Sequence, residues 1–306
     1  MTEAPPAPVM VGIDGSTASI RAAVWAADEA AARDTVLDLV YVVDPEREQE
    51  ADEDAMEDAD EDAMEDAMEA ARHALHRAWE AVTNSGKQVK VESELLQGNP
   101  VVELADAAQR AALLCLGHKG NKDSAPLGRG STASSLARMA PTSVAVVRRW
   151  HIHRRPTFHR WIVALLDEST ASHDVLQAAL DEAVLRQAPV LALTTWSTNE
   201  SEESGTAAQA DDIRAKMDRH LKASRSDKAD LQVCALPMPD DLGHMLEQSA
   251  NIEQLVVVSS ARHDLVDELT GDRARKAMRG THCSILVVHD DTAPEPSADP
   301  DELADS

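Results

Sequence analysis

ALLCLGHKGNKDSAPLGRGST, residues 112–132, places an apolar run, a glycine-rich loop and a helix start in direct succession. The run 112–116 predicts a buried strand. Gly120 and Gly130 would let the backbone approach an anion closely. Ser131 and Thr132 stand where a helix N-terminus offers N–H groups to a ligand. The spacing is neither a Walker loop nor GxGxxG. Two interpretations remain open: a phosphate-binding loop, or a flexible connection between a strand and a helix.

Length and composition limit the class of protein. The 306 residues suit two domains. Aromatic residues make up only 2%, so Val, Leu, Ala and Ile must build the cores. No apolar run approaches the roughly 20 residues that cross a bilayer. The N-terminus lacks the basic start and apolar core of a signal peptide. We therefore expect a cytoplasmic protein.

The net charge of −26 is concentrated in two segments. Residues 46–69 carry a net −13 and residues 290–306 a net −7, which leaves −6 for the rest. This balance argues against nucleic-acid binding, because phosphates would be repelled. Segment 46–69 predicts the solvated start of a long helix, with partner docking or weak divalent-cation binding as alternatives. The tail 290–306 predicts disorder.

Cysteine and histidine give no metal pattern. The three cysteines lie in or beside apolar runs, which predicts buried thiols rather than disulfides: Cys115, Cys234 and Cys283. Paired spacings typical of a zinc site do not occur. His151 and His153 lie in a basic linker, and we interpret them as surface residues rather than ligands. We predict no metal site.

The chain consists of two similar halves joined by a linker at 150–156. Apolar runs predict strands at 9–13, 36–43, 112–116 and 143–147, then at 161–166, 190–195, 231–236, 254–258 and 284–288, and the alternating pattern VKVESELL predicts another at 89–96. Helical patterns lie between them, at 19–33, through the acidic segment, and at 101–110, 133–139, 171–186, 205–224 and 242–250. Continuously apolar strands that alternate with helices indicate a parallel sheet covered on both faces.

Four segments together resemble the universal stress protein family in its tandem form: VGIDGS (11–16), GNP (98–100), the loop 117–132 and PTSVAVV (141–147). The loop spacing Gly-x2-Gly-x9-Gly-[Ser/Thr] is similar to that of the ATP-binding branch. The resemblance implies an α/β fold of two tandem five-stranded parallel-sheet domains, Rossmann-like and adenine nucleotide alpha hydrolase-like. We expect these domains at 9–149 and 158–289. ATP, with or without Mg2+, would lie across the strand C-termini, as the general rule for open α/β sheets predicts.

The resemblance also implies roles for single residues. Asp14 would lie near the ribose or adenine, although an aspartate here is also typical of a helix N-cap. The backbones of Gly12 and Val42 would line the adenine pocket, and Leu116 would pack on the sugar or base. The phosphates would be approached or bound by five loop residues: Gly117, Gly120, Gly130, Ser131 and Thr132.

The second half departs from the pattern in its loop, SSARHDLVDELTGDRARK at 259–276. Ser259 and Arg262 replace Gly117 and Gly120, and Asp272 replaces Ser131. Lost glycines hinder a close approach, and an acid repels phosphate. We therefore expect nucleotide in the first half alone.

The sequence offers no convincing catalytic set, so we expect at most slow ATP hydrolysis. His118 and Lys119 would either touch phosphates or face solvent. The leading hypothesis is a nucleotide-binding regulatory protein of the stress response. Two alternatives are a nucleotide-independent interaction protein that acts through its acidic segment, and an adenine-nucleotide hydrolase. Members of the family pair through their last strand, which implies pairing of the halves and makes a homodimer plausible.

Overall fold

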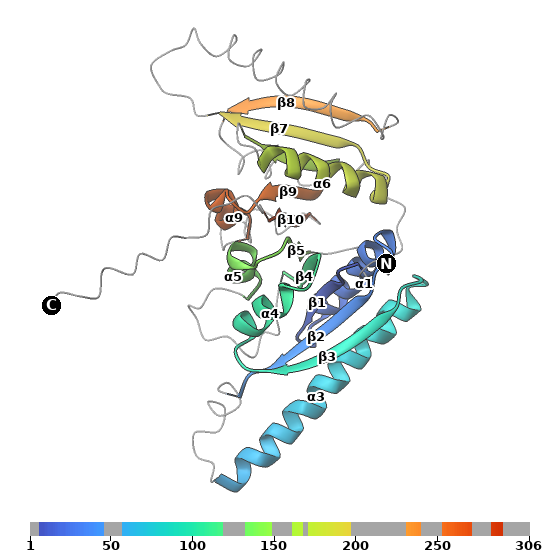
Figure 1. Ribbon diagram of the computed structural model, residues 1–306, viewed down its shortest axis with the longest axis vertical. Helices are drawn as coiled ribbons and strands as arrows, with labels where there is room; N and C mark the ends of the chain where they lie inside the picture. Colours follow the sequence, from blue (N-terminus) through green and yellow to red (C-terminus); the bar gives the residue numbers. More distant parts are fainter. Residues whose placement is uncertain are drawn as a thin grey trace, which may run out of the picture.

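The structure is a computed structural model of the 306-residue chain, and it describes residues 6–45, 57–118, 132–148, 161–167, 171–196, 231–239, 253–270 and 283–289. Its centre is one ten-stranded sheet in the order β3-β2-β1-β4-β5-β10-β9-β6-β7-β8 (Figure 1). The first five strands in this order come from the first half and the last five from the second. The order of the second half mirrors that of the first.

The strands match the apolar runs of the sequence. Their bounds are β1 Val9–Ile13, β2 Leu37–Val43, β3 Val91–Gln97, β4 Leu113–Gly117, β5 Val144–Val147, β6 Trp161–Leu166, β7 Val190–Trp196, β8 Val233–Pro239, β9 Glu253–Ser259 and β10 Ser284–Val288. Neighbouring strands within each half run parallel. The predicted α/β fold with a mostly parallel sheet is confirmed.

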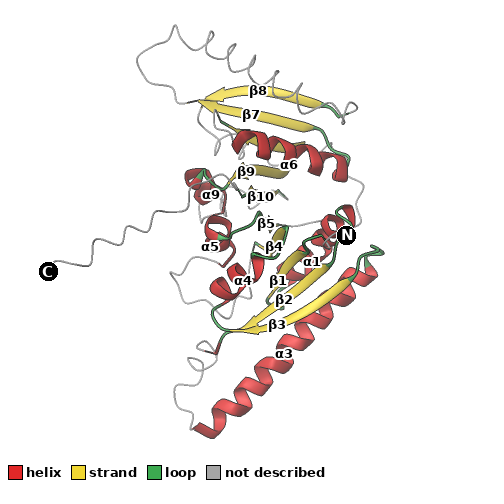
Figure 2. Cartoon of the chain, viewed as in Figure 1, coloured by secondary structure: helices red, strands yellow, loops and turns green. Residues whose placement is uncertain are grey.

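Helices cover both faces of this sheet (Figure 2). One face carries α1 Thr17–Ala32, α3 Glu57–Asn84 and α6 Ala171–Arg186, and their apolar residues form a buried cluster with the sheet. The other face carries α4 Pro100–Ala108, α5 Thr132–Met139 and α9 His263–Thr270, which form a second buried cluster. Burial on both faces explains why the central strands, such as β1, β4, β5, β6 and β10, are continuously apolar.

Local chemistry sets the starts of two helices. Ser16 caps α1, since its side chain accepts a hydrogen bond from the Ser19 N–H at 3.1 Å. Asn99 caps α4 by accepting from the Val101 N–H at 3.0 Å, and Pro100 follows at the first helical position. The asparagine and proline of the GNP segment thus act as a helix start.

The halves join where β5 lies antiparallel to β10, with Ala145 opposite Leu286. Two serines extend this contact in a reciprocal way. The Ser284 hydroxyl oxygen accepts from the Arg148 N–H at 3.2 Å, and the Ser143 hydroxyl oxygen accepts from the His289 N–H at 3.1 Å. The two sheets thereby become one continuous sheet.

Several expectations fall on residues outside the described ranges. These are the helices at 205–224 and 242–250, the linker at 150–156, the tail at 290–306 and most of the acidic segment before α3. One element was not predicted. The second-half segment interpreted as a degenerate loop contains the helix α9, His263–Thr270.

Candidate functional site

The candidate site lies at the carboxyl ends of β1 and β4. The sheet order places β1 between β2 and β4, so the connection after β1 leads to one side of it and the connection from β3 to β4 crosses back to the other side. Ligands of open α/β sheets bind beyond the strand ends at such a switch point. Six of the predicted site residues are described by the structure: Gly12, Asp14, Val42, Leu116, Gly117 and Thr132. Gly120, Gly130 and Ser131 lie outside the described residues.

Asp14 directly follows β1 and organises the turn into α1. Its Oδ1 atom accepts a hydrogen bond from the Ser16 N–H at 3.0 Å, and its own N–H donates to the Ser19 hydroxyl at 3.4 Å. Gly15 between them has a φ of +75°, which favours glycine. The N-cap of α1 is Ser16, so the interpretation of Asp14 as a plain N-cap is wrong. Asp14 instead braces the turn, half-buried at the strand end.

Gly12 and Leu116 face each other across β1 and β4. A Cβ atom on Gly12 would lie 2.7 Å from Cδ2 of Leu116 and 3.3 Å from Cδ1 of Leu104. The missing side chain therefore makes room for two leucines, and Leu116 is only 4% exposed. Leu116 belongs to the buried cluster beneath α4. Its contact with a sugar or base stays a prediction.

Gly117 ends β4 and lies against the first turn of α1. A Cβ atom here would lie 2.7 Å from both the carbonyl carbon of Ala18 and the nitrogen of Ser19. Both neighbours are backbone atoms, so they cannot move aside cheaply. The glycine thus permits close packing of the strand and the helix. The role expected from the sequence, close approach to the phosphates, stays a prediction.

Val42, Thr132 and His118 also lie at this edge of the sheet. Val42 lies opposite Leu96 in the β2–β3 pair and is partly buried. Thr132 is the first residue of α5 and is half-buried. The His118 N–H donates to the Val147 carbonyl oxygen at 3.0 Å, which extends the β4–β5 ladder by one residue. The end of β1, the end of β4 and the turn into α1 are therefore held together by backbone contacts.

In the second half, Asp167 follows β6 as Asp14 follows β1. The Ser172 hydroxyl donates to Asp167 Oδ1 at 2.8 Å. The other carboxylate oxygen, Oδ2, lies 3.7 Å from an Arg262 guanidinium nitrogen. Arg262 also donates two hydrogen bonds to Asp264, at 3.1 and 3.0 Å, and these lower the pKa of Asp264. An arginine at the position of Gly120 thus provides an internal cation for this aspartate.

Helix α9 fills the space after Arg262. Its apolar residues Leu265, Val266 and Leu269 are buried, a helical spacing that could have been recognised in HDLVDELT. Its last carbonyl oxygens accept hydrogen bonds from the first half. The Ser134 hydroxyl donates to Thr270 at 3.0 Å, and the Arg148 guanidinium donates to Leu269 at 3.2 Å. These bonds satisfy carbonyl groups that a helix end leaves unpaired.

The described part of the chain contains neither a metal-binding cluster nor a membrane-spanning helix. No group of three or more His, Cys, Asp or Glu side chains in these ranges is arranged to hold a metal ion. No helix in the described part of the chain combines the length and hydropathy needed to span a bilayer. The acidic residues 46–56 and the histidines at 151 and 153 lie outside these ranges.

Comparison with known proteins gives a consistent result. The sequence model of the universal stress protein family matches residues 7–148 and again 159–289. Universal stress protein Rv2028c of Mycobacterium tuberculosis is 34% identical over 92% of this chain and 96% of its own length. Universal stress protein Rv2624c of the same species is 31% identical over 92% and 95%. A universal stress protein crystal structure from Archaeoglobus fulgidus shares the fold at a TM-score of 0.62 and 13% identity, over 92% and 96% of the two chains.

Proposed function

Because this chain belongs to the universal stress protein family, we propose that it serves the stress response by binding one adenine nucleotide, ATP, in its first half. The contrast between Asp14 and Asp167 carries the proposal. The two aspartates occupy equivalent strand ends. Asp167 already lies beside the guanidinium of Arg262, in the segment after β9. In the first half, the equivalent segment after β4 has no arginine at this position and is rich in glycine.

Three features of the first half support a nucleotide there. The site lies at a switch point of a parallel sheet, where such ligands bind. The loop between β4 and α5 has the spacing Gly-x2-Gly-x9-Gly-Ser. Thr132 starts α5, whose N-terminal N–H groups would favour a phosphate. Mg2+ would accompany the phosphates, since it binds nucleotides chiefly through phosphate oxygens.

The second half supports the stated stoichiometry of one. Its equivalent loop replaces two glycines with Ser259 and Arg262, and helix α9 occupies the segment that follows. In this half Arg262 already lies beside Asp167, and the end of α9 accepts hydrogen bonds from Ser134 and Arg148. The role that we propose for this half is structural support of the first.

The test is an isothermal titration of nucleotide-free protein with ATP and Mg2+. We expect about one ATP per chain and about tenfold weaker binding for Asp14→Asn, the loss of one hydrogen bond to a charged group. Asp167→Asn is the matched control at the equivalent strand end, and it should leave the affinity unchanged. Gly130→Ala should also weaken binding, since it would crowd the phosphates.

Two results would contradict the proposal. Two ATP molecules per chain would disprove the restriction to the first half. No binding by verified nucleotide-free protein would favour the nucleotide-independent alternative. In that case the long helix α3 would become the surface to study, because it extends well past the end of β3 (Figure 1).

A further inference from the structure

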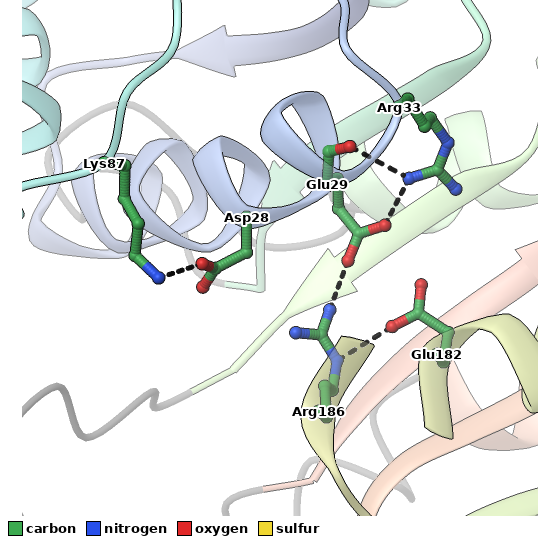
Figure 3. Close-up of polar contacts among 6 residues, drawn as sticks. All are labelled: Asp28, Glu29, Arg33, Lys87, Glu182 and Arg186. Atoms are coloured by element: carbon green, nitrogen blue, oxygen red, sulfur yellow. Dashed lines mark hydrogen bonds and ion pairs between the residues drawn. The ribbon is translucent and has the colours of Figure 1, made fainter. Parts of the chain in front are cut away.

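A cluster of four charged side chains, three of them buried, lies between the two halves, on α1 and α6 (Figure 3). Glu29 and Arg33 come from α1, and Glu182 and Arg186 come from α6. The side chains of Glu29, Glu182 and Arg186 are 1%, 3% and 2% exposed. The predicted nucleotide site lies at the strand ends, and none of these four residues belongs to it.

The contacts within the cluster cross from one half to the other. Arg186 forms an ion pair with Glu29, and its Nε atom lies 2.8 Å from Oε2 of Glu182. Arg33 pairs with the other oxygen of Glu29. The Arg186 guanidinium also lies over the ring of Trp25, 4.4 Å from its centroid. One arginine of the second half therefore bridges two glutamates from different halves.

The cluster derives from a repeat of Glu-x3-Arg in both halves. Glu29 and Glu182 each lie 15 positions after the aspartate at the end of the first strand of their half. The contacts are nevertheless unequal. The Arg33 side chain is 38% exposed, so water screens part of its charge, whereas Arg186 is buried. The buried core of the cluster thus holds two carboxyl groups and one guanidinium group.

Burial of two carboxylates against one buried cation is costly, because desolvation disfavours the charged form and like charges repel. Burial, followed by the charge of Glu29, raises the pKa of Glu182 to about 8. The described groups that face this pair are Arg33 on α1, Arg186 on α6 and Cys115 on β4. Burial raises the pKa of the Cys115 thiol well above its usual range, so this thiol stays neutral.

We propose that Glu182 holds a proton at neutral pH in its buried position beside Arg186 at the contact of the two halves, and that the loss of this proton in alkaline solution weakens that contact. With the proton present, the Glu182 carboxyl group can donate a hydrogen bond to Glu29 across the α1–α6 contact, while Arg186 pairs with the Glu29 carboxylate. Without it, two carboxylates repel each other in a buried site. The strength of the contact between the halves thus depends on pH, and this dependence does not require a bound nucleotide.

The sign of the effect follows from linkage. An acid whose pKa is higher in the folded state than in the unfolded state contributes its full stabilisation at pH values below the unfolded-state pKa. This contribution is lost as the pH rises from the unfolded value of 4.5 through the folded value of about 8. Between about pH 6 and pH 9 the folding equilibrium constant should fall on the order of 10- to 100-fold through this group.

The experiment compares urea unfolding of the full chain at these two pH values for wild type, Glu182→Gln and Glu80→Gln. Glu80 is the matched control, a half-exposed glutamate on α3 that also pairs with a side chain four positions away. Glutamine at 182 cannot ionise, so this variant should lack the 10- to 100-fold decrease. The folding equilibrium constant of the control, Glu80→Gln, should decrease as much as that of the wild type. Equal decreases in wild type and Glu182→Gln would overturn the proposal.

An infrared titration of the wild type makes the test independent of whether the variant folds. The carbonyl stretch of a protonated carboxylic acid should be present at neutral pH and disappear through about pH 8. It should be absent from Glu182→Gln and present in Glu80→Gln. A wild-type spectrum without such a band at neutral pH would disprove the proton on Glu182.

Discussion

The variant Arg186→Met should lose about 3–5 kcal/mol of unfolding free energy, the usual cost of removing one partner from a buried ion pair. Arg186 is the buried cation between Glu29 and Glu182, and its removal leaves two carboxyl groups facing each other at the contact of the halves. Methionine retains contact with the Trp25 ring, so the loss reports on charge more than on packing. Urea or thermal unfolding at neutral pH measures it.

Arg33→Met is the matched control for this variant. Arg33 is the equivalent arginine of the first half and also pairs with Glu29, but it is 38% exposed. Its removal should cost about 1 kcal/mol or less. Adding Glu29→Gln and Glu182→Gln to Arg186→Met should recover most of the loss, since no uncompensated charge then remains. If Arg186→Met and Arg33→Met cost the same, the cluster is hydrated in solution and the explanation fails.

The second large effect is expected for Gly117→Val, at about 3 kcal/mol of destabilisation. The new side chain would begin 2.7 Å from backbone atoms of Ala18 and Ser19, so α1 would have to move away from β4. That movement would also disturb the hydrogen bonds that Asp14 makes with Ser16 and Ser19. Nucleotide affinity should therefore fall together with stability, in parallel measurements of unfolding and ATP titration.

Ser259→Ala provides the comparison at the equivalent position of the second half. Ser259 already carries a Cβ atom, and its side chain accepts a hydrogen bond from the Ala261 N–H at 3.1 Å. Its loss should cost about 1 kcal/mol and leave ATP affinity unchanged. A Gly117→Val protein with normal stability and weak ATP binding would show that this glycine serves the ligand alone.

Most strands could be predicted from the sequence because they are apolar runs covered on both faces, whereas β3, VESELLQ, could be predicted from its alternation of apolar and polar residues. The helix α9 was missed because its segment was compared with the glycine loop of the first half, position by position. Its own spacing of Leu265, Val266 and Leu269 was a local signal that this comparison concealed. The α9 end is also held by Ser134 and Arg148 from the first half, contacts that no local pattern reveals.

The candidate site could be predicted only in part. The position of Asp14 at a strand end followed from the alternation of strands and helices, but the packing roles of Gly12 and Gly117 did not. Those roles depend on where Leu116 and the first turn of α1 lie in three dimensions. The buried glutamates were missed for a similar reason. Glu29 follows the polar spacing of α1, and its burial depends on a helix more than 140 residues away.

The antiparallel contact of β5 with β10 has a consequence for how the chain folds. Val146 and Ile285 pair across nearly half of the sequence, so this step closes a very long loop and should be late and slow. Until it occurs, each half presents an unpaired strand edge that a second chain could occupy. The covalent link keeps the correct edge at a high effective concentration, which favours closure within one chain. Refolding from concentrated protein should therefore give domain-swapped dimers, and dilution should suppress them.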